Sequence, residues 1–119
     1  MEELKIAEAE YRFAELVWEK EPIASGELVK LCEKELSWKK STTYTVLRRL
    51  CEKGIFRNEQ SVVTSLIKKE EYTALRSEQF VEDTFDGSLP MFLSAFMSRK
   101  KLNKKQIDEI QKLIDAYEE

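Results

Sequence analysis

The chain of 119 residues contains no histidine, two cysteines, two prolines and three glycines. The absence of histidine excludes the commonest general base, the serine–histidine triads and most zinc sites. Because prolines and glycines are few, the composition favours a mostly helical chain with short loops. The longest uncharged stretch, residues 87–98, has 12 residues, whereas a membrane-spanning helix needs roughly 20. The acidic start, Met1-Glu2-Glu3, is not followed by an apolar segment, so we expect no secretory signal and a cytoplasmic protein.

Charge is distributed unevenly along the chain. Residues 1–35 carry 5 basic and 10 acidic side chains, residues 36–69 carry 8 and 2, and residues 70–119 carry 7 and 11. The formal net charge of −3 therefore consists of segments of −5, +6 and −4. A basic centre in a net-acidic chain is typical of a protein that presents one positive face to nucleic acid. An ordinary solvated helix face that is merely basic is the alternative explanation.

The first half of the chain has the pattern of three helices and a hairpin. Apolar spacing predicts helices over about 7–20, from Ala24 or Ser25 onward, and over about 41–53. Ser25 is a candidate cap for the second helix, and Gly54 is suited to the left-handed position after the third. β-Branched residues around a polar turn at 58–61 predict strands at 55–57 and 62–67.

The second half of the chain has the pattern of three more helices. The first is expected over about 69–85, ended by the Asp86-Gly87-Ser88 break. The next spans roughly 89–99, with Ser88 as its cap and Pro90 in its first turn. Asn103 and Gln106 have the spacing of a capping box at the start of the last helix.

Three helices followed by a β-hairpin, with a basic outer face on the third helix, are the plan of a winged helix-turn-helix domain. We therefore predict a mostly α fold with a small β-hairpin. Residues 1–70 would form the winged-helix DNA-binding domain, and residues 71–119 a helical dimerisation region. The third helix would enter the major groove of double-stranded DNA, and the hairpin would lie along its backbone.

The outer face of the predicted third helix and its surroundings carry side chains suited to DNA. Hydroxyl groups can donate to phosphates or base edges, and cationic groups can neutralise phosphates. Arg49 and Lys53, four residues apart, are expected to hold phosphates near the helix end. The predicted DNA-contacting residues are Lys39, Lys40, Ser41, Thr42, Tyr44, Thr45, Arg48, Arg49, Lys53 and Arg57. The alternative is that the threonines only cap the helix and the arginines are ordinary surface charges.

The predicted helix at residues 89–97 is apolar nearly all round and needs more burial than a small domain provides. It could be buried in its own domain. We favour an interface with a second copy, because inverted-repeat operators require two-fold symmetry. The predicted dimerisation residues are Leu89, Met91, Phe92, Leu93, Phe96, Met97, Ile110, Leu113 and Ile114.

The remaining reactive or aromatic side chains are interpreted as packing residues. Cys32 and Cys51 lie in apolar helical stripes without metal-ligand spacing, so we expect reduced core thiols, with a redox sensor as the alternative. Trp18 is expected in the core or at a helix end, and Trp38 over the second and third helices. The sequence contains no glycine-rich phosphate loop and no nucleophile paired with a base, so we expect no enzyme, metal or cofactor.

Several segments are similar to a known family in their order and spacing. They are Ile6–Tyr11, Leu16–Lys20, Trp38 with Thr42–Gly54, Asn58-Glu59, Glu70–Tyr72 and Phe85–Pro90. Together they resemble the penicillinase repressor family of bacterial transcriptional regulators over nearly the whole chain. The resemblance implies a winged helix followed by a helical dimerisation region, and a homodimeric repressor that binds inverted-repeat operators and blocks transcription initiation.

The chain also departs from this family. The family often has serine where Ala7 stands, and commonly glycine where Ser61 stands at the wing tip. Copper-responsive members end in paired Cys-x-Cys motifs, which are absent here, so copper sensing is not expected. Members that respond to β-lactams are cut within the dimerisation region. By resemblance the bond here is Ala95–Phe96, which a membrane sensor protease would cut, but Ala95 replaces the asparagine of those members. A winged-helix module that binds an acidic protein partner is the alternative function.

Overall fold

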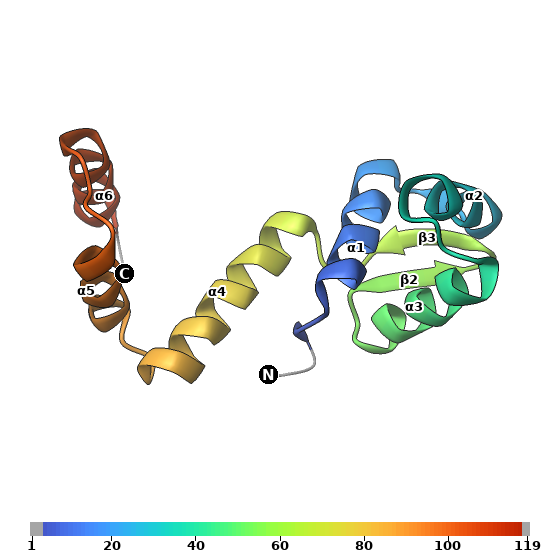
Figure 1. The fold of residues 1–119 in the computed structure, drawn as a ribbon, viewed down its shortest axis with the longest axis horizontal. Helices are drawn as coiled ribbons and strands as arrows, with labels where there is room; N and C mark the ends of the chain where they lie inside the picture. The colour runs from blue at the N-terminus through green and yellow to red at the C-terminus, as the bar shows by residue number, and fades with distance from the viewer. Residues whose placement is uncertain (1–3, 118–119) are drawn as a thin grey trace. The chain divides into compact units, whose positions relative to one another are not determined.

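The structure, a computed structural model, describes residues 4–117. Its elements, in chain order (Figure 1), are α1 (Glu8–Lys20), β1 (Ile23–Ala24), α2 (Ser25–Leu36), α3 (Lys40–Glu52), β2 (Phe56–Glu59), β3 (Val62–Ser65), α4 (Lys69–Phe85), α5 (Leu89–Arg99) and α6 (Lys104–Ala116). The chain divides into two compact units, Met1–Gln79 and Phe80–Glu119. None of the described helices is long and apolar enough to cross a bilayer. Met1-Glu2-Glu3, on which the expectation of no secretory signal rests, lies outside the described residues.

The first unit is a winged helix-turn-helix domain, so the predicted fold class is confirmed. Three helices, α1 to α3, pack with an antiparallel sheet whose strand order is β1-β3-β2 (Figure 1). The wing hairpin pairs β2 with β3, from Phe56 opposite Ser65 to Glu59 opposite Val62. The strand β1 completes the sheet by pairing Ile23 with Val63.

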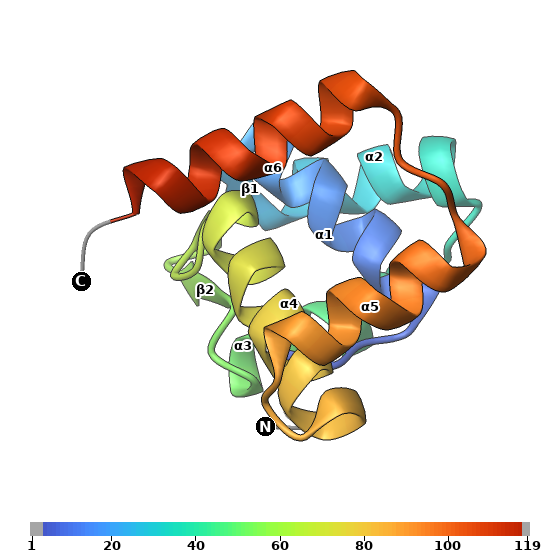
Figure 2. The same ribbon diagram turned by 90° about the vertical axis from the view of Figure 1, so that its left-hand side faces the viewer.

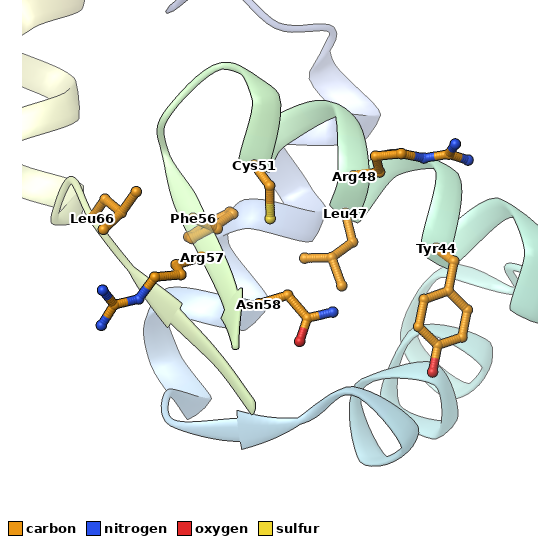
Figure 3. A pocket seen from close by; sticks show the side chains of 8 residues that line it. All are labelled: Tyr44, Leu47, Arg48, Cys51, Phe56, Arg57, Asn58 and Leu66. Carbon is orange, nitrogen blue, oxygen red and sulfur yellow. The ribbon is translucent and has the colours of Figure 1, made fainter. Parts of the chain in front are cut away.

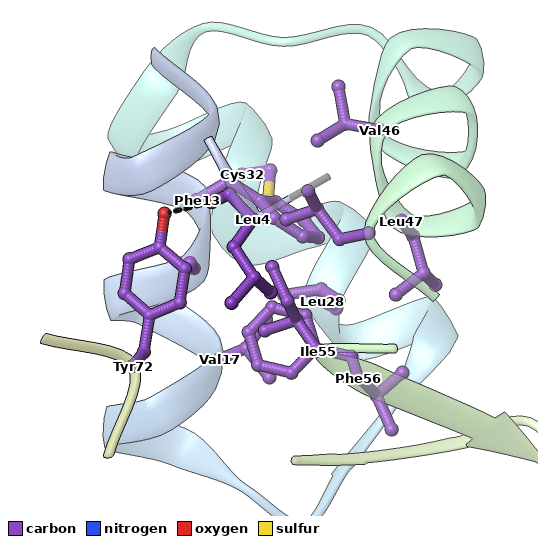
Figure 4. Packing of buried hydrophobic residues seen from close by; sticks show 13 residues of the cluster. Leu4, Phe13, Val17, Leu28, Cys32, Val46, Leu47, Ile55, Phe56 and Tyr72 are labelled. Atoms are coloured by element: carbon purple, nitrogen blue, oxygen red, sulfur yellow. Dashed lines mark hydrogen bonds between the residues drawn. The ribbon is translucent and has the colours of Figure 1, made fainter. Parts of the chain in front are cut away.

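The core of this domain lies between the three helices and the sheet, and each of α1, α2 and α3 contributes buried side chains to it (Figure 4). Phe13 of α1 is fully buried and stacks on Trp38, with ring centroids 5.7 Å apart. The ring centroids of Trp18 and Phe56 of β2 lie 5.6 Å apart, and Trp18 Nε1 donates to the carbonyl of Ile67 at 2.9 Å. Both tryptophans are therefore packing residues, as predicted, although the stacking partner of Trp38 lies on α1.

The structure corrects two local predictions and adds a strand pairing that the sequence did not indicate. The hairpin turn is Gln60-Ser61, not 58–61, with φ of 53° and 63° at its two residues. Positive φ at both central positions fits a two-residue turn of the type that matches strand twist, so β2 extends through Asn58 and Glu59. Ser25 is not a cap: α2 follows Ala24, which gives no side-chain capping bond. The pairing of β1 with β3 was not predicted, because two residues carry no periodic signal.

The third helix matches its prediction closely. It begins at Lys40 and ends at Glu52, one residue earlier at each end than expected. Gly54 follows with φ of 81°, which is the left-handed position predicted for it. The inward stripe is the predicted one, since all four of its residues are buried: Thr43, Val46, Leu47 and Leu50.

α4 and α5 begin and end where the sequence predicts, and α6 begins where it predicts but ends at Ala116, before Tyr117. The hydroxyl of Ser88 accepts a bond from the Met91 amide at 3.1 Å at the start of α5. Asn103 and Gln106 make both bonds of the capping box that opens α6. Figure 2 shows α5 and α6 running in opposite directions, joined by a short connection. The functional boundary between residues 70 and 71 stays a prediction.

Candidate nucleic-acid interface

The outer face of α3 is polar and exposed because the residues of its inward stripe are buried in the core. Side chains three and four residues apart share a helix face, so burial of the inward stripe leaves the intervening positions in solvent. Exposed predicted DNA-contacting residues on and just before this helix are Lys39, Lys40, Ser41, Thr42, Thr45, Arg48 and Arg49. These residues therefore form one continuous polar surface along the helix.

Two of the predicted hydroxyl donors have partners within the domain. Thr45 Oγ1 donates to the Ser41 carbonyl one turn earlier, at 2.9 Å, which leaves its lone pairs available as acceptors. Tyr44 is half-buried, and its hydroxyl lies 3.2 Å from the Ser25 hydroxyl. That bond ties α3 to the first residue of α2, so Tyr44 has a structural role that the sequence did not indicate.

The two adjacent arginines of α3 have different surroundings. Arg49 forms an ion pair with Glu10 of α1, a carboxylate whose side chain is only 10% exposed. The other oxygen of Glu10 accepts a hydrogen bond from the Ala7 amide at 3.1 Å. This bond satisfies a backbone amide at the start of α1, although Ala7 has no side-chain hydroxyl to act as a cap. Arg48 has no carboxylate within ion-pair distance among residues 4–117. Arg48 is therefore free to meet an external anion, whereas Arg49 compensates a buried charge.

Glu10 is a residue that sequence reasoning missed. Its spacing of three from Ala7 matches half of a capping box, and it lies on the inward stripe of α1, between Ile6 and Phe13. A carboxylate on an apolar stripe requires a partner. The sequence contained this signal, but it could not show that the partner lies 39 residues away on α3.

The cations at the other end of α3 lie beside the wing and the N-terminal segment. Lys53 is half-buried, and its Nζ donates to the carbonyl of Lys5 at 3.4 Å. Arg57 on β2 is exposed and, like Arg48, has no ion-pair partner in the part of the chain that the structure describes. The unpaired cations thus lie on both α3 and the wing.

The wing is held against α1 by Glu21, the residue directly after that helix. Its Oε1 accepts bonds from the Ser65 amide at 2.7 Å and the Ser65 hydroxyl at 2.9 Å. Lys68 Nζ lies 3.4 Å from the same oxygen. Burial alone would raise the pKa of this carboxyl, but the bonds from Ser65 and the charge of Lys68 hold its pKa below the ordinary value.

Replacing Glu21 by glutamine is expected to destabilise the domain at neutral pH more than at acidic pH. A carboxyl whose pKa is lowered by folding stabilises the native state above its unfolded pKa, and this contribution is lost as the pH falls through the folded pKa. The difference in unfolding free energy between wild type and Glu21→Gln should therefore shrink on acidification. Urea unfolding at a series of pH values measures it, with the exposed Glu19→Gln as matched control. A pH-independent difference would contradict this role.

The two thiols are placed as the sequence predicts. Cys32 is fully buried and Cys51 is half-buried. Burial raises the pKa of both thiols, which keeps the reactive thiolate scarce at neutral pH. Among the described residues, no three or more metal-ligating side chains are grouped so that they could hold a metal ion.

The second unit exposes much of its apolar surface. Neither α5 nor α6 contains a buried residue. Most of the predicted dimerisation residues are exposed: Leu89, Met91, Phe96, Met97, Leu113 and Ile114. The others, Phe92, Leu93 and Ile110, are half-buried. Ala95 and Phe96, the predicted cleavage residues, are exposed within α5.

Comparison with known proteins gives concordant matches. The sequence model of the penicillinase repressor family matches residues 6–116. The chain is 24% identical over 117 residues to a penicillinase repressor of Bacillus licheniformis, covering 95% of this chain and 91% of that protein. It is 21% identical over 115 residues to the methicillin resistance regulatory protein MecI of Staphylococcus aureus, covering 93% and 94%. A penicillinase repressor of Staphylococcus aureus is 22% identical over 117 residues, covering 95% and 93%.

Proposed function

The chain belongs to the penicillinase repressor family, and from this membership we propose that it is a transcriptional repressor. It binds double-stranded operator DNA as a homodimer and has no enzymatic activity. Its relatives are named as repressors or as a resistance regulator. We propose that it acts in the bacterial cytoplasm, where operator DNA lies.

The observation that carries the proposal is the coincidence of unpaired cations with the two elements that contact DNA in a winged helix. Arg48 lies on the exposed face of α3, and Arg57 lies on the wing strand β2. In this class of domain the third helix enters the major groove and other elements contact the backbone. Lys39, Lys40, Ser41, Thr42 and Thr45 would add phosphate or base contacts from the same helix face.

The exposed apolar surface of α5 and α6 supports a homodimer. Leu113 is 73% exposed and Ile114 59%, and large contiguous apolar surfaces mark interaction sites on soluble proteins. A two-fold dimer would place two copies of α3 on successive half-sites of an inverted repeat. A second copy would cover this exposed apolar surface and supply the two-fold symmetry that an inverted repeat requires.

Binding of an acidic protein partner through the basic face is the weaker alternative. That function would use exposed aromatic side chains beside the cations. Trp38 instead stacks on Phe13, and the Tyr44 hydroxyl bonds to Ser25, so both rings serve the domain itself.

Induction by a membrane sensor protease remains a proposal drawn from the family. The Ala95–Phe96 bond is exposed but lies inside the helix α5. Proteases bind extended segments, so cleavage at this bond requires α5 to unwind locally. Incubation with such a protease, followed by mass analysis of the products, tests the site directly.

The proposal predicts salt-dependent, sequence-selective DNA binding. Fluorescence anisotropy with an inverted-repeat fragment of the protein's own promoter should show tighter binding than a shuffled fragment. Log affinity should fall linearly with log salt concentration, because each phosphate neutralised releases counterions. No preference for the inverted repeat, or a salt slope near zero, would contradict the proposal. Capture of an acidic protein partner by a variant that binds no DNA would support the alternative function.

A further inference from the structure

A pocket lies between α3 and the wing strand β2 (Figure 3). Its volume is about 550 Å³, within the range of about 300–1,000 Å³ that small-molecule sites occupy. Figure 3 shows the side chains of Leu47, Cys51 and Phe56 between the two elements. Leu47 and Phe56 are almost fully buried, so each presents only a small part of its side chain to the pocket, whose floor is apolar.

One wall of the pocket is an exposed apolar side chain that the fold itself does not require. Leu66 lies directly after β3 and is 52% exposed. Its backbone amide is used, since it donates to the Ile55 carbonyl at 2.8 Å, but its side chain is left half in solvent. An apolar ligand in the pocket would cover this side chain together with the floor.

The polar groups around the pocket are cationic. Arg48 extends from α3 and Arg57 from β2 at opposite ends of it, and their guanidinium groups are directed outward, away from each other (Figure 3). Neither guanidinium has a carboxylate within ion-pair distance among the described residues. The remaining polar lining comes from Tyr44 and Asn58. An apolar floor with the Arg57 guanidinium at its edge, on the same side as Leu66, is complementary to a small molecule with an apolar body and one anionic group.

We infer that this pocket binds a small amphipathic organic monoanion, such as an aryl carboxylate, and that the bound anion competes with DNA. The competition rests on the proposed function, because Arg48 and Arg57 are also the proposed phosphate contacts. An anion that pairs with Arg57 removes that guanidinium group from the DNA interface. A rise in the concentration of the small acid would then release the protein from its operator.

The ligand site is tested without DNA, on the full-length protein, by NMR titration with 1-naphthoate. A ligand of about a dozen non-hydrogen atoms in an open pocket should bind with Kd on the order of 1 mM. Saturable shifts should centre on the amides of Leu47, Cys51 and Asn58. The neutral analogue 1-naphthalenemethanol should bind at least about 5-fold more weakly, as should 1-naphthoate to Arg57→Gln.

Two results would overturn the site. Shifts centred on the exposed apolar residues of α5 and α6, such as Met91 and Leu113, would show that naphthoate only covers the apolar surface of the second unit. Equal affinity for the neutral analogue would show that the guanidinium groups do not select an anion.

The competition is tested separately by DNA anisotropy. At ten times its Kd, 1-naphthoate should weaken DNA binding about 10-fold, by simple mass action. Sodium acetate at the same concentration is the matched control for ionic strength and should weaken binding less. Equal effects of the two salts would overturn the competition. If the protein binds no DNA at all, the proposed function fails, and the NMR titration still decides whether the pocket binds the anion.

Discussion

Replacing Leu113 by glutamate is expected to convert the dimer to a monomer and to weaken binding to an inverted-repeat operator by about 100-fold or more. Leu113 is 73% exposed within α6, so the substitution costs the folded monomer little. In a dimer it would place a charge in an apolar interface without a partner. The second half-site contact then becomes a separate bimolecular event, which loses the gain of two linked contacts.

The experiment separates assembly from folding. Sedimentation velocity reports the oligomeric state, circular dichroism reports the helical content, and anisotropy reports the operator affinity. Lys112→Gln is the matched control, because it makes the same change in charge at the neighbouring position of α6, away from the apolar side chains. A Leu113→Glu variant that remains dimeric with full operator affinity would show that α6 is not at the interface.

Replacing the two adjacent arginines of α3 by alanine, one at a time, is expected to affect different properties. Arg49→Ala should mainly lower the stability of the domain, and Arg48→Ala should mainly lower its affinity for DNA. Arg49→Ala removes the partner of a buried carboxylate, Glu10. Breaking a fully buried pair costs about 3–5 kcal/mol. Because the Arg49 side chain is 51% exposed, water can replace part of the lost interaction, and we expect a loss of about 1–2 kcal/mol of unfolding free energy. Arg48→Ala should change stability by no more than about 0.5 kcal/mol.

DNA affinity should show the reverse order. Arg48→Ala removes an unpaired cation from the α3 surface and should weaken operator binding about 10-fold, with a reduced salt slope. Arg49→Ala should weaken it less, when measured at a temperature where the variant remains folded. Urea unfolding and anisotropy on both variants measure the two quantities.

A double-mutant cycle isolates the pair between α1 and α3. Glu10→Gln removes the charge that Arg49 compensates, so the cost of Arg49→Ala should be smaller in the Glu10→Gln background. The same cost in both backgrounds would show that the pair does not stabilise the domain. A larger loss of DNA affinity for Arg49→Ala than for Arg48→Ala would show that Arg49 contacts phosphate, as the sequence predicts.

The local chemistry of the chain was readable from the sequence because it acts over a few residues. The left-handed Gly54 after α3, the Ser88 cap of α5 and the capping box from Asn103 to Gln106 all occur where spacing predicted them. The inward stripe of α3 follows from helical periodicity alone. The apolar character of α5 likewise indicated a surface in need of a partner.

The same kind of local evidence failed where a short segment depends on a distant one. The two residues of β1 form a strand only because β3 offers an unpaired edge to them. Gln60 and Ser61 adopt positive φ because the register of β2 and β3 leaves two residues for the turn. Neither dependence is visible in the residues themselves.

The sequence by itself determined the winged-helix plan, the basic centre of the chain and the polar face of α3, because periodicity and charge are properties of neighbouring residues. Only the tertiary structure decided what each cation on that face can do. It pairs Arg49 with a buried carboxylate of α1, leaves Arg48 without an ion-pair partner among residues 4–117, and brings Arg57 of the wing to the opposite end of a shared pocket. The physical reason is that the packing of α1 and β2 against α3 sets whether an arginine compensates an internal charge or remains available to an external anion.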